Sequence, residues 1–163
     1  PGAVKASGGP STIAQDTMED GRLYDILVVP GGRGTRNVGG DTTFLSWLKS
    51  QSKGAEYTTS VCTGSLLLAK AGILNRRRAT TNKLAFDWVA DQTGGVDWQR
   101  IARWVRDGSV YTSSGVSAGM DMALAVIEDC LGAKAAADAA TYAEYIRNPN
   151  ADNDPFASVG GTT

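Results

Sequence analysis

The residues best suited to carry out chemistry in this sequence surround Cys62. The stretch 55–69 begins with β-branched and aromatic residues and continues with the leucines and alanines of a buried helix. Because only Cys62, Thr63 and Gly64 separate the two halves, we predict a strand that turns directly into a helix, with the cysteine on the bend. Unpaired N–H groups at a helix start favour the nucleophilic thiolate, and Gly64 leaves space for a ligand. A nucleophilic thiol and a buried structural cysteine are both compatible with this position.

A glycine turn is predicted to lie beside this cysteine. Leu23–Val29 ends in a continuous apolar run, the pattern of a strand covered on both faces, and Gly31 and Gly32 follow closely. In an open parallel sheet, ligands bind at the carboxyl ends of the strands, where both this turn and Cys62 fall. Backbone N–H groups after the glycines and at Thr63 could then stabilise a developing negative charge, as an oxyanion hole does.

Composition excludes several other chemistries. The chain contains no histidine, so it cannot build a Ser-His-Asp triad or a Cys-His dyad by itself. Its two cysteines, Cys62 and Cys130, provide neither a zinc site nor a disulfide scaffold, and a reducing, cytoplasmic compartment is expected. A net charge of -1 and a pI near 5.4 indicate neither nucleic-acid nor membrane-surface binding. We find no uninterrupted apolar stretch of membrane-spanning length.

The order of the predicted elements indicates an α/β fold in a single domain. The strand at 23–29 is followed by a helix that begins at Asp41 or Thr42 and ends at Gly54, and then by the strand and helix around Cys62. This alternation implies a parallel sheet with right-handed crossovers. With 163 residues and 42% hydrophobic content, the chain can bury a core of ordinary size.

A tight hairpin is predicted in the second half of the chain. Asp107-Gly108 is the strongest hairpin signal, between apolar segments 101–106 and 109–112. We expect at least four parallel strands between helical layers, with Val28 and Val61 buried and the hairpin as an antiparallel appendage at one edge.

The C-terminal third is predicted to be helical and then irregular. A helix from Val116 to Gly132 carries Cys130 on its apolar face, which predicts an inert, packed thiol. A second helix, rich in alanine, covers 133–146, and the segment 148–163 is predicted to be a loop or a frayed tail. Trp88 and Trp104 could each be core residues or line the site.

Five segments, in order, resemble motifs of the ThiJ/PfpI superfamily, and within it those of isocyanide (isonitrile) hydratases: Val29–Gly32, Ser60–Ser65, Ala71–Leu74, Arg78–Thr81 and Val116–Asp121. The resemblance extends from about Pro1 to Ile146. It implies a flavodoxin-like three-layer sandwich with a mostly parallel sheet, of the class I glutamine-amidotransferase type. It also implies a homodimer that acts on a small molecule without a cofactor.

The resemblance also implies roles for individual residues. In hydratases of this kind the motif cysteine, here Cys62, is the nucleophile, and the following threonine, Thr63, contributes to the site. The second glycine of the Pro-Gly-Gly turn, Gly32, helps to form the oxyanion hole. We place Gly31, Gly64 and Asn82 with it as oxyanion-hole or substrate-binding positions, and we expect no metal.

Two features depart from the family pattern. Many members have a histidine after the Thr-Thr pair, where this chain has Asn82, and this argues against a peptidase-like activity. The family also begins with a strand and helix that precede Pro1 and carry its catalytic acid. We therefore interpret 1–147 as a single domain that lacks this first unit, and we expect a separate N-terminal fragment, cleaved in the Gly/Pro-rich opening 1–10, to stay bound. The carboxylates Asp16, Glu19, Asp20 and Asp25 lie in a predicted solvated loop, and none is assigned as the acid.

The function that we expect is a cysteine-dependent lyase, a hydratase that converts an isocyanide into an N-formamide. One alternative is a thiol enzyme of the glyoxalase or deglycase type, against which Asn82 argues. Another is a non-catalytic ligand-sensing domain of the same fold, as in transcription regulators, although the chain has no basic segment for binding DNA.

Overall fold

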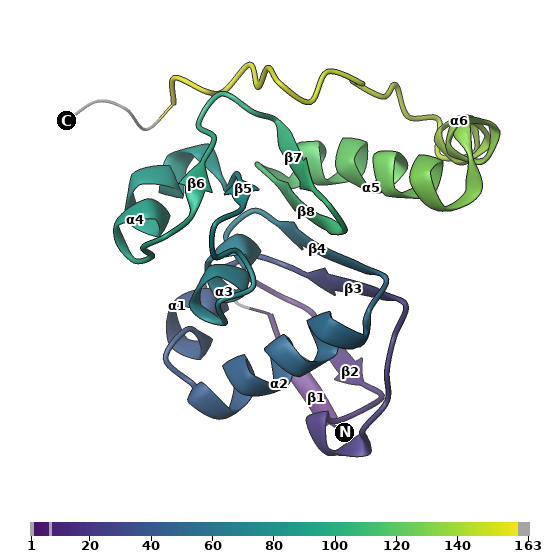
Figure 1. Cartoon of the computed structure of the whole chain (residues 1–163). Helices are drawn as coiled ribbons and strands as arrows, with labels where there is room; N and C mark the ends of the chain where they lie inside the picture. The colour runs from purple at the N-terminus through teal and green to yellow at the C-terminus, as the bar shows by residue number, and fades with distance from the viewer. Residues whose placement is uncertain (1, 7, 160–163) are drawn as a thin grey trace.

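The structure is a computed structural model that describes residues 2–6 and 8–159, and within them four strands form the main sheet (Figure 1). The strand order is β3 (Ile26–Val29), β4 (Tyr57–Val61), β8 (Val110–Ser113) and β7 (Trp104–Asp107). β3, β4 and β8 are parallel, whereas β7 pairs antiparallel with β8. The carboxyl ends of β3 and β4 therefore meet at the same edge of the sheet.

Helices cover both faces of this sheet. α2 (Thr42–Gly54) and α3 (Gly64–Lys70) pack on one face, and α5 (Val116–Leu131) packs on the other (Figure 1). The core under α2 and α3 includes Val29, Leu48, Leu68 and Leu74, and the core under α5 is formed by Trp104, Tyr111, Met122 and Val126. The predicted flavodoxin-like sandwich is confirmed.

Helix α2 shows how local sequence sets an element. The Asp41 carboxylate accepts hydrogen bonds from the amides of Thr43 and Phe44, at 2.9 and 3.0 Å. This N-cap satisfies donors that a helix start leaves unpaired. The helix ends at Gly54, so both predicted boundaries are confirmed.

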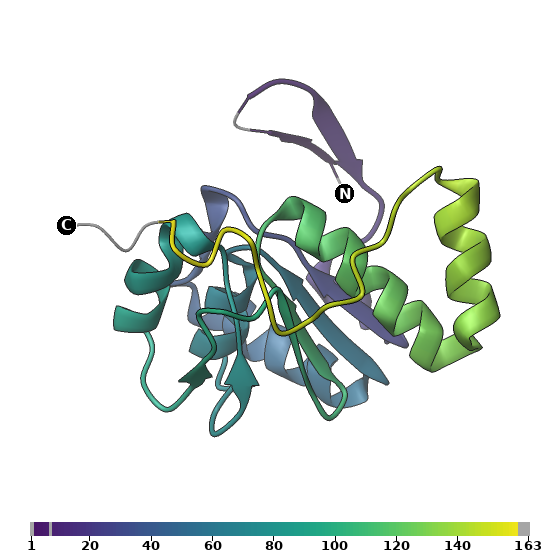
Figure 2. The same ribbon diagram turned by 90° about the horizontal axis from the view of Figure 1, so that it is seen from above.

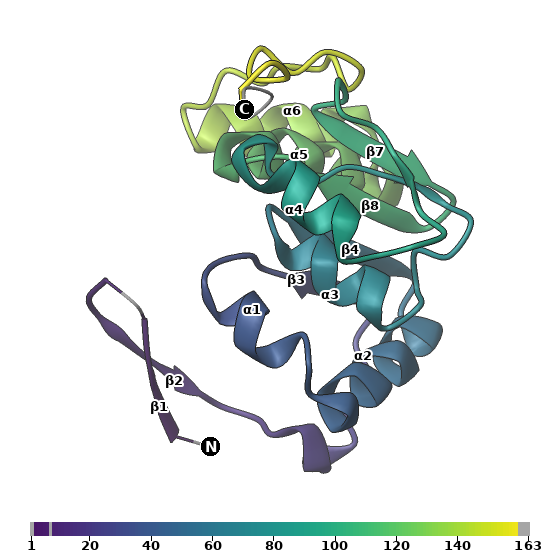
Figure 3. The same cartoon turned by 90° about the vertical axis from the view of Figure 1, so that its left-hand side faces the viewer.

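The remaining described elements have two to ten residues each. They are β1 (Gly2–Lys5), β2 (Ser11–Ala14), the 3-10 helix η1 (Met18–Asp20), α1 (Gly34–Val38), β5 (Arg78–Ala79), the 3-10 helix η2 (Lys83–Ala85), α4 (Phe86–Asp91), β6 (Asp97–Trp98) and α6 (Ala133–Tyr142). β1 and β2 form an antiparallel hairpin that projects from the body as an arm (Figure 3). None of the described helices has the length and apolar character needed to cross a membrane.

The sheet differs from the prediction in two respects. Within the described residues, β7 and the parallel strands β3, β4 and β8 make up the main sheet, so a fourth parallel strand is absent from it; β5 pairs instead with β6 in a separate ladder. The Asp107-Gly108 hairpin is also no appendage, because β8 lies inside the sheet between β4 and β7. The turn chemistry predicted the hairpin correctly but could not indicate which sheet edge its strands would join.

Strand β3 is covered on one face only. Val29 faces α3 and is 5% exposed, whereas Val28, on the face shared with α5, is 59% exposed and Ile26 is 46% exposed. The prediction that Val28 is buried is therefore wrong. Helix α5 lies over β4, β7 and β8, and beside it a groove lined by Ile26, Val28, Val61 and Met122 stays open.

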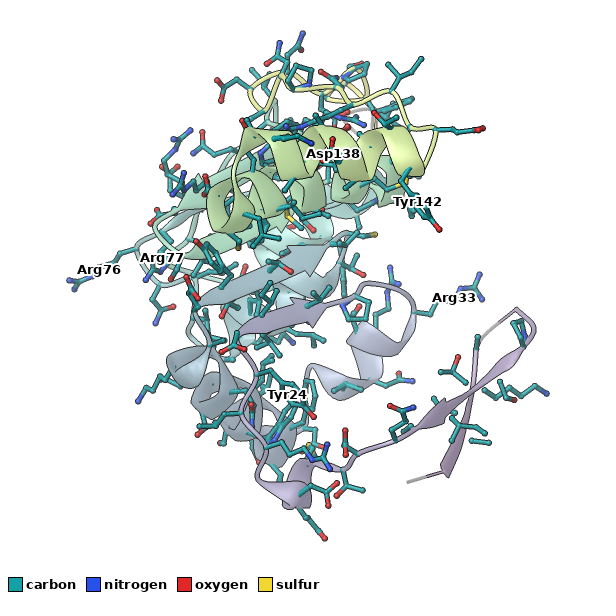
Figure 4. The ribbon with its side chains drawn as sticks, turned by 90° about the vertical axis from the view of Figure 1, so that its right-hand side faces the viewer. Tyr24, Arg33, Arg76, Arg77, Asp138 and Tyr142 are labelled. Atoms are coloured by element: carbon teal, nitrogen blue, oxygen red, sulfur yellow. The ribbon has the colours of Figure 1, made fainter. Side chains whose placement is uncertain are left out.

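The C-terminal segment is irregular but packed. From α6 the chain runs back across the molecule toward α4 (Figures 1 and 2). α6 ends at Tyr142, earlier than predicted, and Tyr142 points outward (Figure 4). Within the described part of the tail, Asp154 is buried, so 148–159 is a fixed loop rather than a frayed end.

Candidate active site

Cys62 lies on a strained bend between β4 and α3. Its φ is 58°, in the left-handed region that residues with a side chain rarely adopt. Three hydrogen bonds hold its backbone: the Cys62 amide donates to the Ser113 carbonyl at 3.1 Å, and its carbonyl accepts from the hydroxyls of Ser65 and Thr81, each at 3.1 Å. Such strain persists only where neighbouring contacts fix it, and it is common at functional sites. This is the geometry of a nucleophile elbow.

The glycine turn and the elbow pack against each other without space for another atom. A Cβ at Gly31 would lie 2.7 Å from the Thr63 nitrogen and 2.8 Å from the Cys62 Cβ. A Cβ at Gly64 would lie 2.1 Å from the Val29 carbonyl oxygen. The structure thus brings Gly31, Gly64, Thr63 and Cys62 together at the sheet edge that the sequence indicated.

The Thr63 hydroxyl joins the two turns. It accepts a hydrogen bond from the Gly32 amide at 3.0 Å and lies 3.2 Å from the Thr35 hydroxyl of α1. Gly32 has a φ of 119°, which only glycine adopts readily. Because the Gly32 N–H already binds Thr63, a reaction intermediate would have to compete for this donor. Within residues 2–6 and 8–159 no hydrogen bond occupies the Thr63 amide, which therefore is a second candidate donor.

Asn82 lies close to Gly115, the residue that precedes α5. Its side-chain oxygen accepts from the Ala85 amide and caps η2, and its amide nitrogen lies 4.0 Å from where a Cβ would stand on Gly115. Asn82, Ser114 and Gly115 line a pocket of about 180 Å³. Asn82 follows Thr81, so it is adjacent in the chain to a residue that contacts Cys62 directly.

Trp104 and Trp88 differ in burial and in their contacts. Trp104 is 5% exposed in the core under α5 and does not line the site, whereas Trp88 is half-buried and lies 4.4 Å below the Arg36 guanidinium of α1. Arg33, just after the glycine turn, extends outward (Figure 4).

Cys130 is exposed, so the prediction that it is packed is wrong. The apolar stripe of α5 ends before the last turn of that helix.

Charged groups near the pocket are paired with one another. Burial lowers the pKa of Lys83 to about 8, partly opposed by Asp154. Arg103 binds Asp121 through Nε at 2.8 Å and Nη2 at 2.7 Å. No local sequence pattern indicates this cluster, because its members are far apart in the chain. Within the part of the chain that the structure describes, no group of acidic, cysteine or histidine side chains could hold a metal ion.

The predicted loop carboxylates lie away from the elbow. Asp16 binds Tyr24 and Arg22, and Asp20 caps η1 through Thr17. Asp25 precedes β3, at the opposite end of that strand from the glycine turn. None of these three carboxylates is therefore a candidate for the acid beside Cys62.

The fold and the elbow together define a class of protein. The sequence pattern of the DJ-1/PfpI family matches residues 1–129, and the chain belongs to this family. It is 36% identical over 150 residues to the isonitrile hydratase of Pseudomonas putida, a match that covers 92% of this chain and 64% of the hydratase.

Further matches include a solved structure and a transcriptional regulator. A ThiJ/PfpI family protein from Pseudomonas syringae superposes with a TM-score of 0.80 at 32% identity, over 90% of this chain and 60% of that protein. The HTH-type transcriptional regulator CdhR of Pseudomonas aeruginosa is 30% identical over 132 residues, covering 80% of this chain and 38% of the regulator. This chain thus spans less than two thirds of these relatives.

Proposed function

We propose that this chain forms the cysteine-bearing part of a hydratase that adds water to an isocyanide and releases an N-formamide. The observation that carries the proposal is the strained Cys62 elbow, whose backbone is fixed by three hydrogen bonds beside the Gly31-Gly32 turn. The similarity to the P. putida isonitrile hydratase supports the substrate class.

The proposed reaction proceeds in two steps. The thiolate of Cys62 attacks the terminal carbon of the isocyanide, an S–C bond forms, and a proton is delivered to that carbon to give a thioimidate. Water then adds to the same carbon, the S–C bond breaks, and the thiolate is released together with the N-formamide. The amides of Thr63 and Gly32 orient the bound carbon and nitrogen. The overall change is the addition of one water molecule, and it needs no oxidant or reductant.

We further propose that the proton donor is a carboxylate of a segment outside residues 1–163. Asp121 and Asp154 are buried in pairs with Arg103 and Lys83 and are poor candidates. The open face of β3 offers a place for such a segment, because a continuous apolar strand is expected to be covered on both sides. A homodimer is proposed as well, on the family resemblance alone.

The experiment compares two substrates and two cysteine variants. The protein is purified from its source together with any segment that accompanies residues 1–163. It is incubated with methyl isocyanide or methylglyoxal, and products are measured by mass spectrometry. We expect N-methylformamide, a loss of at least about a hundredfold in rate for Cys62→Ser, and an unchanged rate for Cys130→Ser. Consumption of methylglyoxal alone would support the glyoxalase-type alternative. Binding of either compound without turnover would instead support a ligand-sensing domain like that of the regulator.

A further inference from the structure

A pocket of about 180 Å³, lined by Asn82 and Ser114, is formed in part by the C-terminal tail. Its base consists of Asn82, Ser114 and Gly115, each close in the chain to a residue that holds the Cys62 backbone. Its outer wall includes Phe156 and Val159 of the tail. Asn82 and Ser114 of this pocket are thus chain neighbours of Thr81 and Ser113, which hold the Cys62 backbone.

Three exposed apolar side chains gather at this pocket. Leu84 is 75% exposed, Phe156 is 57% exposed and Val159 is 38% exposed, and all three line the pocket. They come from η2 and from the tail, which lie far apart in the sequence. Apolar side chains that converge on a concave site with a few polar groups are typical of ligand pockets. Lys83 and Arg103 are each paired with Asp154. We therefore expect the apolar side chains at the rim to select the ligand.

The tail is held in place by buried interactions. Its backbone binds strand-side residues through Arg103 N–H to Ala151 O and Asp154 N–H to Ile101 O, each 2.7 Å. The Asp154 carboxylate, 1% exposed, lies 3.8 Å from an Arg103 nitrogen and 3.9 Å from the Lys83 nitrogen. A carboxylate this deeply buried is stable only beside its cations, so Asp154 fixes the tail in one position.

We propose that 148–159 is a strap that forms a pocket for the organic group of the substrate. Phe156 is the specificity-determining residue of this pocket, and Asp154 is a positioning residue. The pocket takes an apolar, ring-sized organic group while the reacting carbon lies at Cys62. A cavity of about 150 Å³ is known to hold benzene, so the volume suits such a group. The identity of the reacting carbon rests on the proposed function. The binding of an apolar ring in the pocket is independent of that function.

Binding is tested first, without turnover. Benzyl alcohol is titrated into the isotope-labelled protein, and amide chemical shifts are followed by NMR. We expect changes at Ser114, Ala118 and Phe156, and an affinity about tenfold lower in Phe156→Ala. Phe156 is largely exposed, so this variant is expected to fold. Shifts elsewhere, or equal affinity in the variant, would overturn the pocket assignment whether or not isocyanides are substrates.

Kinetics then test specificity and positioning. For benzyl isocyanide, Phe156→Ala and Asp154→Asn should raise KM about tenfold and leave kcat within about twofold. For methyl isocyanide, whose organic group does not reach the strap, both parameters should stay within about twofold. Asp152→Asn is the matched control, because Asp152 lies on the same strap but is exposed. Equal losses for both substrates in Phe156→Ala would show that the strap supports the fold and does not select the substrate.

Discussion

At the scale of single residues, Cys62 and Cys130 offer a direct comparison of two thiols. Cys130 is exposed and Cys62 is only partly exposed, so accessibility alone favours Cys130. We expect iodoacetamide near neutral pH to modify Cys62 first, because it stands on the elbow next to the Thr63 amide and the start of α3. Peptide mass spectrometry over time gives both rates, and the Cys130→Ser variant confirms the assignment. Faster or equal modification of Cys130 would contradict a nucleophilic role for Cys62.

The close approach at Gly64 leads to a prediction for stability and activity. In Gly64→Ala the new methyl group would meet the Val29 carbonyl, so the elbow must move away from β3. We expect a loss of about 2 kcal/mol or more in the free energy of unfolding, together with loss of activity. Gly34→Ala is the control, since nothing lies within 4 Å of a Cβ there. Urea denaturation of the two variants measures the difference.

Lys83 makes the stability depend on pH. Its pKa is lowered to about 8 by burial, while Asp154 raises it and Arg100 lowers it further. Between about pH 8 and its ordinary value, the unfolded chain binds more protons at this lysine than the folded chain, so the free energy of unfolding rises with pH. We expect the wild-type protein to gain about 1 kcal/mol or more between about pH 7.5 and pH 9.5 relative to Lys83→Met. A parallel pH response in the two proteins would contradict this contribution.

At the scale of elements, Asp121 connects α5 to three other parts of the fold. Its carboxylate is fully buried and accepts hydrogen bonds from Arg103 of the segment before β7, Tyr145 after α6 and the Asn148 amide of the strap. Removing its charge leaves Arg103 buried with Asp154, 3.8 Å away, as its remaining carboxylate partner among the described residues.

We therefore expect Asp121→Asn to lower the free energy of unfolding by about 3 kcal/mol. Glu128→Gln, on the same helix, removes a more exposed pair with Arg147 and should cost less than about 1 kcal/mol. Denaturant unfolding compares them. Similar losses in both variants would show that burial does not increase the contribution of the Asp121–Arg103 pair to the free energy of unfolding.

At the scale of the whole molecule, β3 has one uncovered edge and one uncovered face within the described residues. Within the described residues β3 has only β4 as a partner, and its second face presents Ile26 and Val28. An open apolar strand edge promotes association with other chains. We propose that a strand and helix from outside residues 1–163 cover it, and that this segment brings the acid for Cys62.

Intact-mass measurement and a denaturing gel of protein purified from its source test this arrangement. We expect this chain to copurify with such a segment, as a second fragment or within a longer polypeptide, and Val28→Lys to release a separate fragment. Val4→Lys, on the projecting hairpin, is the control for an exposed apolar residue. If the polypeptide 1–163 alone hydrates an isocyanide, both the covering segment and its acid are wrong. Light scattering of the same preparation tests the homodimer.

The sequence by itself determined the elements whose cause is local. The apolar run before Gly31, the Asp41 cap, the Asp107-Gly108 turn and the change from β-branched residues to leucine at Cys62 each act within a few residues, and each predicted its element correctly. The parallel order of β3 and β4 then placed the glycine turn beside the cysteine, because parallel strands end at one edge.

Only the tertiary structure decided which surfaces each element meets. Val28 and Val29 are equivalent in the sequence, yet one is exposed and the other buried, because α5 covers β4 and not β3. The pairing of Lys83 and Arg103 with Asp154 likewise depends on a tail that returns across the sheet, and no local pattern encodes that path. The Cys62 elbow was therefore predictable from its own bend, whereas the pocket lined by Asn82 and Phe156 depends on contacts between segments distant in the chain.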